Sequence, residues 1–391
     1  MFAQKKSFKD FYYPTVSKKD WKDYNWQLNN RIRNLEKLSS YIKIDKGALS
    51  KLGKFEKNLN FSITPYYLSL INPENEEDPI RKQCVPTLEE FETLEGESDP
   101  LGEKENMPVS GLIHKYPDRA LILATNICPV YCRHCFRRGE WDKGENVASL
   151  QNLQLMFEYI KSKTSIKEVI ISGGDPLFLS DFLLDFILRE LRKIGNVEVI
   201  RIASRVPVVL PQRITKELSS ILKKYSPIWF VTHFNHFNEI TDESSKCVEN
   251  LLLSKAIVLN QTVLLKGIND NSETIEKLFR ALLKIGVKPY YLFECDPAKG
   301  VTHFRTSLFK GLEIMESLRG RVSGLAQPTF ALDTQGGGKV PLLPNYVLSY
   351  KENSVLVRNY EGKIFEYQNP YRDKEFSAPL LPFEDKIKSG K

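Results

Sequence analysis

From about residue 112 the chain alternates short apolar, β-rich runs with longer segments whose apolar residues recur at helical intervals. The runs that predict strands are 120–125, 167–175, 197–205, 228–235, 256–265 and 288–296. The segments between them that predict helices are 145–164, 178–195, 211–225, 244–255 and 271–286. Five or six strand-then-helix units with right-handed crossovers predict a parallel α/β sheet, either doubly wound or closed toward a barrel.

Polar residues cluster just after the ends of these runs, where the loops of a barrel fold build an active site. They are Asn126, Asp175, Arg205, His233, Asn260 and Asp296.

The two ends of the chain have different patterns. Residues 1–110 read as an α-rich N-terminal extension, with a helix predicted over 23–42. Residues 321–391 carry the segment DTQGGGKVP and then two β-rich runs, which predict a hairpin around NYEGK. The sequence therefore predicts three parts, 1–110, 111–320 and 321–391.

Composition narrows the class of protein. The 391-residue chain is 41% hydrophobic and 27% charged, as expected for an ordinary globular protein with a core. Its net charge of +7 is spread over mixed segments, so neither a basic stripe nor a nucleic-acid partner is expected. No apolar run approaches the roughly 20 residues of a membrane helix, and no secretory signal is recognised. A cytoplasmic location without membrane contact is the expectation.

Three of the six cysteines crowd into one stretch, as Cys128-x3-Cys132-x2-Cys135. Structural zinc needs four ligands, usually from a second pair, and the chain has no such pair. A thioredoxin-like motif would use only Cys132 and Cys135. The third interpretation is a [4Fe–4S] cluster, in which three thiolates leave one iron open to a ligand from outside the protein.

Two glycine-rich stretches add candidate chemistry. SGGD, residues 172–175, allows close backbone approach but is also a common turn. In DTQGGGK the glycines offer flexible access to Lys339, whose amine can form a Schiff base with pyridoxal 5′-phosphate. Alone, that stretch is equally compatible with a turn and a solvated lysine.

The cysteine spacing after a first strand resembles the signature of radical S-adenosyl-L-methionine enzymes. The resemblance implies that Cys128, Cys132 and Cys135 bind the [4Fe–4S] cluster and that its open iron binds S-adenosyl-L-methionine. It also implies that the Gly-Gly-acidic turn contributes to binding this cofactor, through Ser172, Gly173, Gly174 and Asp175. The implied fold is an incomplete (β/α)6-type TIM barrel.

A narrower resemblance runs from about residue 20 to about residue 370. The stretches HKYPDRALIL, YCRHCFRR, IRIASRVPVVLPQRIT, THFNH, YYLFECD and DTQGGGKVPLLPNYV are similar to the lysine 2,3-aminomutase family. Members of that family move the α-amino group of L-lysine to the β-carbon, through a 5′-deoxyadenosyl radical and an imine to pyridoxal 5′-phosphate. The resemblance implies an isomerase that yields β-lysine.

The same resemblance assigns residues to roles. Lys339 matches the Schiff-base lysine, and Arg137 matches the arginine that binds the substrate carboxylate. Asp296 and Asp333 match the acids that hold the distal ammonium of lysine, and glutamate-specific relatives change both positions. Arg119 and Gln261 match positions that help to seat pyridoxal 5′-phosphate, and Tyr116 and His233 match further cofactor-binding positions.

The chain departs from the family in three places. The glycine segment has Gln335 where proline is typical, and it is one glycine shorter. Asn271 occupies a position used for structural zinc in clostridial-type members and no cysteine follows Cys295, so no zinc is expected. Lys115 replaces a usual arginine, which keeps the charge but loses the planar fork.

Several alternatives and partners remain open. The nearest alternative is a relative that supplies β-lysine for attachment to elongation factor P, or another amino-acid 2,3-aminomutase. More distant alternatives are a radical enzyme acting on RNA and a non-enzymatic cluster protein. The expected partners are a small-molecule substrate, L-lysine, and a reductant such as flavodoxin or ferredoxin, in a homo-oligomer.

Overall fold

The computed structural model describes residues 8–55, 60–92, 95–334, 337–343, 345–350 and 354–368. The chain forms two compact units, residues 1–343 and 344–391. The three-part division predicted from the sequence stays a prediction. The structure nevertheless puts the Lys339 segment in the first unit, because its strand pairs with the main sheet.

The first unit is built on a nine-stranded sheet in the order β1 to β9. Strands β2 to β8 run parallel, as the alternating pattern predicts, while β1 and β9 are antiparallel edges. The strands are β1 (Leu112–Tyr116), β2 (Arg119–Thr125), β3 (Glu168–Gly173), β4 (Val199–Ala203), β5 (Ile228–Thr232), β6 (Ala256–Leu264), β7 (Lys288–Glu294), β8 (Thr329–Thr334) and β9 (Gly338–Pro341).

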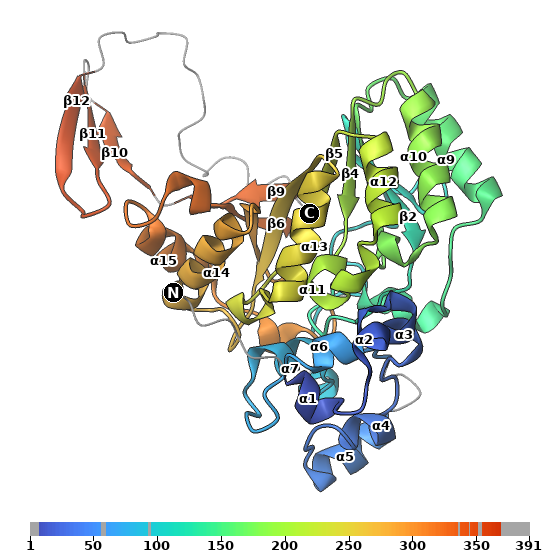
Figure 1. The fold of residues 1–391 in the computed structure, drawn as a ribbon. Helices are drawn as coiled ribbons and strands as arrows, with labels where there is room; N and C mark the ends of the chain where they lie inside the picture. Colours follow the sequence, from blue (N-terminus) through green and yellow to red (C-terminus); the bar gives the residue numbers. More distant parts are fainter. Residues whose placement is uncertain are drawn as a thin grey trace. The chain divides into compact units, whose positions relative to one another are not determined.

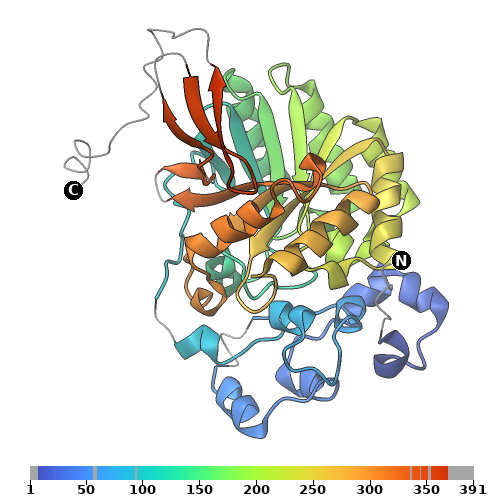
Figure 2. The same cartoon turned by 90° about the vertical axis from the view of Figure 1, so that its left-hand side faces the viewer.

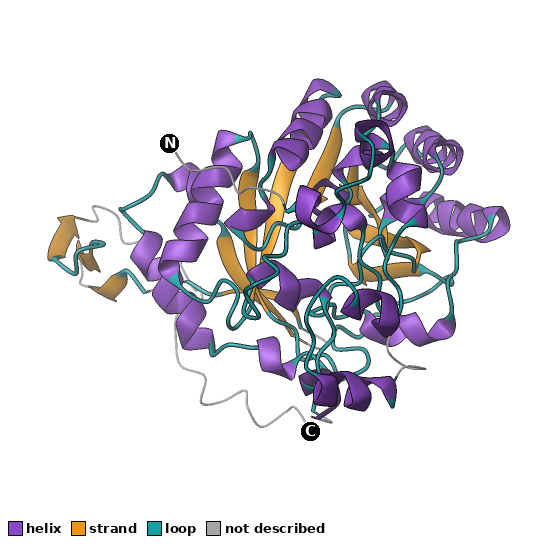
Figure 3. Ribbon diagram, turned by 60° about the horizontal axis from the view of Figure 1, so that its bottom comes forward, coloured by secondary structure: helices purple, strands orange, loops and turns teal. Residues whose placement is uncertain are grey.

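Helices follow the parallel strands and cover the outer face of the curved sheet (Figures 1 and 3). They are α9 (Leu150–Ser162), α10 (Asp181–Lys193), α11 (Val206–Val209), α12 (Lys216–Lys224), α13 (Asp242–Leu253), α14 (Ser272–Lys284) and α15 (Leu308–Leu318). Sheet edges β1 and β9 approach each other, since the amide of Lys339 donates to the hydroxyl of Tyr116 at 3.0 Å. The result is the incomplete barrel that the sequence predicts, and the fold class is confirmed.

Helix α14 illustrates why these segments are helical. The side chain of Asn271 accepts a hydrogen bond from the amide of Thr274 and so caps the first turn. Ile275, Leu278, Phe279 and Leu282 recur at helical spacing and are buried against the sheet. The family resemblance associates the position of Asn271 with structural zinc. In this chain Asn271 is a helix cap.

The N-terminal extension lies against one end of the barrel, blue in Figures 1 and 2. Its helices are α1 (Lys9–Tyr12), α2 (Lys18–Lys22), α3 (Tyr24–Asn29), α4 (Leu35–Ser39), α5 (Lys46–Gly53), α6 (Pro65–Leu68), α7 (Pro79–Cys84) and α8 (Glu89–Glu92). It meets loops that leave the carboxyl ends of the strands: Thr64 bonds the carbonyl of Val209, and Tyr67 donates to Glu239. The extension therefore covers the end of the barrel where an active site is expected.

The helix predicted over 23–42 is broken, and that prediction is wrong in detail. Helix α3 ends at Asn29 and α4 begins at Leu35, with the side chain of Asn34 as its cap. Between them, Ile32 forms a β-bridge with Ile63. A partner distant in the sequence thus takes the backbone of Ile32 out of the helical pattern.

The second unit is a three-stranded antiparallel sheet of β10 (Val347–Tyr350), β11 (Ser354–Arg358) and β12 (Ile364–Gln368). The predicted hairpin around NYEGK is confirmed, because β11 and β12 pair from Ser354↔Gln368 to Arg358↔Ile364. None of the helices in the described part of the chain has the length and apolar character needed to span a membrane.

Candidate active site

The cysteine loop follows β2, at the carboxyl end of the parallel strands. Cys128, Cys132 and Cys135 are free thiols and are partly exposed. The amide of Cys135 donates to the carbonyl of Cys132 at 3.0 Å, which closes a turn. Among the described residues, no three His, Cys, Asp or Glu side chains are placed so that together they could bind one metal ion. Thiols that bind different irons of one cluster are not expected to converge in that way.

The N-terminal extension holds the backbone of the cysteine loop. Arg31 donates through Nη1 to the carbonyl of Cys128 at 3.2 Å. The hydroxyl of Ser62 donates to the carbonyl of Pro129 at 2.9 Å, and the amide of Tyr131 donates back to the carbonyl of Ser62 at 3.1 Å. The extension is therefore part of the framework that positions the thiols.

A buried ion-pair cluster anchors the far end of the same loop. Glu90 accepts from Nε of Arg133 at 2.9 Å and from Nη2 of Arg138 at 2.6 Å. The side chain of Glu90 is fully buried and that of Arg133 is 1% exposed. Burial opposes ionisation of Glu90, but Arg133 and Arg138 outweigh it and hold the pKa of Glu90 below its usual range. Removing Glu90 would leave the guanidinium groups of Arg133 and Arg138 without their carboxylate partner in a buried environment.

Replacing Glu90 by alanine is expected to lower the free energy of unfolding by about 3–5 kcal/mol, because an uncompensated buried charge remains. Denaturant titration of the purified protein measures this loss. Glu89→Ala, which removes an exposed neighbouring carboxylate, is the matched control and should stay within about 0.5 kcal/mol of the parent. Equal stability of the two variants would contradict the anchoring role.

Arg205 connects the cysteine loop to a buried polar network that sequence reasoning did not predict. Its Nη1 donates to Sγ of Cys132. Its Nη2 donates to Glu239 at 2.7 Å and to the hydroxyl of Tyr67 at 3.0 Å. Glu239 is fully buried. The one signal in the sequence was the position of Arg205 directly after a strand.

The chemistry of this loop fits an iron–sulfur cluster. Burial raises the pKa of Cys128, and burial together with the neighbouring Cys132 raises the pKa of Cys135 to about 11. Iron binding must therefore displace protons from these thiols. The guanidinium of Arg205 also donates a charged hydrogen bond to the sulfur of Cys132. Three thiols from one loop could hold a cluster with one iron left open.

The glycine turn after β3 packs directly on the start of the cysteine loop. A Cβ at Gly173, whose φ is +130°, would lie 2.1 Å from the carbonyl oxygen of Thr125. A Cβ at Gly174 would lie 2.4 Å from the carbonyl oxygen of Ile127. The glycines therefore allow the two loops to touch, which sets the turn beside the thiols.

Asp175 and Ser172 flank that turn and differ in what they can offer a cofactor. The carboxylate of Asp175 accepts from the hydroxyl of Ser204 and from the amide of Arg205, both at 2.8 Å. Burial raises the pKa of Asp175 against these hydrogen bonds. The oxygens of Asp175 thus accept hydrogen bonds from within the protein, whereas the hydroxyl of Ser172 accepts from Nη1 of Arg137 at 3.3 Å.

Lys339 and Asp333 face each other across the edge of the sheet. They are direct partners in the antiparallel pairing of β8 and β9, so their side chains leave the same face. Nζ of Lys339 lies 3.2 Å from Oδ2 of Asp333 and 5.2 Å from the ring centre of Phe293. Gln335 and Gly336, where the sequence departs from the family, lie outside the described residues.

Tyr116 and Arg119 complete the surroundings of Lys339. A Cβ at Gly338, whose φ is +74°, would lie 2.8 Å from the hydroxyl of Tyr116, so this glycine is needed for the contact. The guanidinium of Arg119 lies 3.8 Å from the ring centre of Tyr116 and pairs with Asp118. A lysine amine, aromatic faces and an arginine suited to a phosphate form a set that fits pyridoxal 5′-phosphate.

Asp296 follows β7 and is coupled to the same group of charges. Burial and the nearby carboxylate of Asp333 raise the pKa of Asp296 to about 7, while Lys339 and Arg137 act in the opposite direction. The structure thus brings together four residues that the sequence separates by up to about 200 positions. Two carboxylates that interact in this way favour a cation between them.

Arg137 lies at the other side of this group and is already engaged. Its Nε and Nη2 form a bidentate ion pair with Glu103, at 2.8 and 2.6 Å. Sequence reasoning did not predict Glu103, which lies in a loop of unremarkable acidic composition.

His233 directly follows strand β5, and Gln261 lies in the neighbouring strand β6. Burial and the charge of Arg205 lower the pKa of His233 to about 4, although a hydrogen bond to the backbone of Gln261 opposes the shift. The lowered pKa favours the neutral form of His233, which can donate or accept a hydrogen bond.

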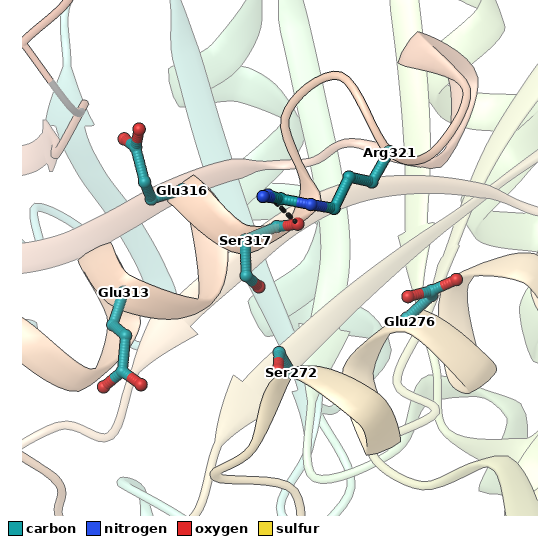
Figure 4. A pocket seen from close by; sticks show the side chains of 6 residues that line it. All are labelled: Ser272, Glu276, Glu313, Glu316, Ser317 and Arg321. Carbon is teal, nitrogen blue, oxygen red and sulfur yellow. Dashed lines mark hydrogen bonds between the residues drawn. The ribbon is translucent and has the colours of Figure 1, made fainter. Parts of the chain in front are cut away.

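A separate cavity of about 490 Å³ lies outside the barrel, between α14 and α15 (Figure 4). Its lining residues are Ser272, Glu276, Glu313, Glu316, Ser317 and Arg321. Two of its carboxylates are already paired within their own helices, Glu276 with Arg280 and Glu313 with Lys310. None of the candidate cofactor-binding or substrate-binding residues lines this cavity, so we do not assign it as the active site.

Comparison with known proteins agrees with this geometry. A family model described as the radical SAM superfamily matches residues 122–289, and one described as lysine-2,3-aminomutase matches residues 315–381. The L-lysine 2,3-aminomutase of Acetoanaerobium sticklandii is 48% identical over 93% of this chain and 88% of its own length. That of Clostridium subterminale is 46% identical over 91% of this chain and 86% of its own.

A relative with another printed activity also matches. The glutamate 2,3-aminomutase of Clostridioides difficile is 42% identical over 90% of this chain and 84% of its own length. Identity at this level over nearly whole chains, together with both family models, establishes the relationship. The chain belongs to the lysine 2,3-aminomutase family of radical S-adenosyl-L-methionine enzymes.

Proposed function

We propose that this chain isomerises L-lysine to β-lysine with pyridoxal 5′-phosphate attached to Lys339. Membership of the radical S-adenosyl-L-methionine superfamily implies a [4Fe–4S] cluster and S-adenosyl-L-methionine, and pyridoxal 5′-phosphate is part of the proposal. When bound, these groups supply a carbon radical able to abstract the unactivated C3 hydrogen and a ring that delocalises the unpaired electron.

One observation carries the choice of substrate: Asp333 lies 3.2 Å from Lys339, and its carboxylate acts with burial to raise the pKa of Asp296. A pair of carboxylates in a partly dry site attracts the distal ammonium of lysine. The side-chain carboxylate of glutamate would meet two like charges there, at a cost of several kcal/mol. This contrast separates the proposal from glutamate isomerisation.

The other residues receive roles that follow from their chemistry. The planar fork of Arg137 suits the α-carboxylate of the substrate. Arg119 and Tyr116 border Lys339 and suit the phosphate and ring of its cofactor. Ser172 and the backbone at Gly173 and Gly174 would contribute to binding S-adenosyl-L-methionine, Gln261 would help to seat pyridoxal 5′-phosphate, and His233 would be a further cofactor contact. Asp175 contributes by joining the loops that carry these groups.

Product analysis tests the proposal. Anaerobically reconstituted protein is incubated separately with L-lysine and L-glutamate, with both organic cofactors and a chemical reductant present. We expect β-lysine as the main product, with turnover reduced by roughly a hundredfold in Asp333→Asn. Asp185→Asn on the outer helix α10 is the matched control and should be fully active. Faster formation of β-glutamate than β-lysine would contradict the proposal.

The pKa of Asp296 makes a prediction about pH. Because burial and Asp333 raise it to about 7, Asp296 is increasingly protonated as the pH falls below 7, and it then no longer attracts an ammonium. The KM for lysine, measured between pH 6 and 9, should rise toward low pH. A flat profile in the parent enzyme would contradict the role of Asp296.

The physiological partners stay predictions. They are a reductant such as a flavodoxin or ferredoxin and assembly into a homo-oligomer.

A further inference from the structure

Arg137 is nearly saturated with hydrogen bonds from inside the protein. Glu103 takes Nε and Nη2 in a bidentate ion pair at 2.8 and 2.6 Å. Nη1 donates to the hydroxyl of Ser172 at 3.3 Å and to the carbonyl of Gly173 at 3.2 Å. A guanidinium has five N–H donors, so these contacts leave one.

The edge of Arg137 that Glu103 uses is the one best suited to an amino-acid carboxylate. Two parallel N–H···O bonds from a planar fork form the preferred geometry for any carboxylate, whether internal or from a ligand. The two side chains are 15% and 16% exposed, so solvent reaches the pair. A substrate carboxylate cannot form the same bidentate contact while Glu103 remains in place.

The loop that carries Glu103 is tied to the segment that carries Asp296. The amide of Glu97 donates to the carbonyl of Pro297 at 2.8 Å, and the amide of Lys299 donates to the carbonyl of Glu97 at 3.0 Å. Within the loop, the carboxylate of Asp99 accepts from the amide of Glu103 at 2.9 Å. Glu103 is therefore presented from a defined turn.

The same loop borders open space. A hollow of about 440 Å³ is lined by residues of the 97–105 stretch, among them Glu97, Asp99 and Glu105. Glu103 does not line this hollow, but its side chain is partly exposed, which gives it access to solvent when it leaves Arg137.

We propose that Glu103 is a positioning residue that stands in for the substrate α-carboxylate on Arg137 and is displaced when an amino acid binds. The inference rests on the proposed function, because it takes Arg137 as the carboxylate site. Glu103 then lowers the affinity for every ligand that must displace it from Arg137. In the empty site it keeps the guanidinium of Arg137 aligned. A diamine without a carboxylate gains nothing from its removal.

Steady-state kinetics of Glu103→Gln test this inference. The substitution keeps the shape and removes the charge, so the KM for lysine should fall by roughly threefold or more, with kcat nearly unchanged. Glu105→Gln, an exposed carboxylate two residues away, carries the same change of charge and should leave KM unchanged. The inhibition constant for pentane-1,5-diamine should not improve in Glu103→Gln.

An unchanged or higher KM in Glu103→Gln would overturn the inference, as would an equal gain for the diamine. Thermal melting and iron content of each variant confirm that fold and cluster are retained, and Glu103→Ala provides a second variant with the same expected direction. Failure of the proposed function has a different signature, since the parent enzyme would then form no β-lysine at all.

Discussion

Lys339→Ala is expected to reduce formation of β-lysine by roughly a thousandfold or more, in the range found when a group that acts covalently is deleted. The structure supports this because Lys339 is the amine that lies beside Asp333 and within 5.2 Å of the ring of Phe293, next to Tyr116. In the proposed enzyme, the substitution would remove the covalent attachment of pyridoxal 5′-phosphate, and it also removes the ion-pair partner of Asp333.

The attachment can be measured without turnover. Borohydride reduction of the parent protein should fix the cofactor on the peptide containing Lys339, as detected by mass spectrometry, and the label should be absent from Lys339→Ala. Lys310→Ala is the matched control, because Lys310 is an exposed lysine paired only with a neighbour on its own helix. Labelling of another lysine in the parent would overturn the assignment.

Cys132→Ala should abolish cluster binding and, with it, reductive cleavage of S-adenosyl-L-methionine. A cluster held by three thiolates has no protein ligand to spare. The fold should survive, because Arg205 keeps its contacts to Glu239 and Tyr67 when the sulfur is removed. Iron content should fall from about four per chain to near zero, while the melting temperature changes little.

Cys247→Ala provides the control for that change. Cys247 is a buried free thiol in α13 and not part of the Cys128–Cys135 loop, so its loss should leave iron content and cleavage unaffected. Retention of a full cluster in Cys132→Ala would show that the ligands have been misassigned.

The sequence predicted the parallel strands and their helices well because both signals are local. Alternating and helical patterns reflect burial within one element, and the thiols and Lys339 lie in short motifs with a chemical meaning. The broken helix near Ile32 shows the limit of this reasoning. Its conformation depends on Ile63, 31 residues away in the chain.

The same limit applies to the supporting residues of the site. Glu103 meets Arg137 across 34 residues, and Arg205 meets Cys132 across 73. Nothing in the neighbouring sequence distinguishes Glu90, Glu103 and Glu239 from other glutamates. Only the fold shows that each of them pairs with an arginine. Pairwise electrostatics between distant segments carries no periodic signal, so these partners could not be predicted.

The central claim is that three thiolates leave one iron of the cluster open and that S-adenosyl-L-methionine binds there. Electron–nuclear double resonance on the reduced, reconstituted protein tests it most directly, with S-adenosyl-L-methionine isotopically labelled in its amino nitrogen and its carboxylate. We expect magnetic coupling between the cluster and both labelled groups. A fully formed cluster that shows no coupling to either label would contradict the account.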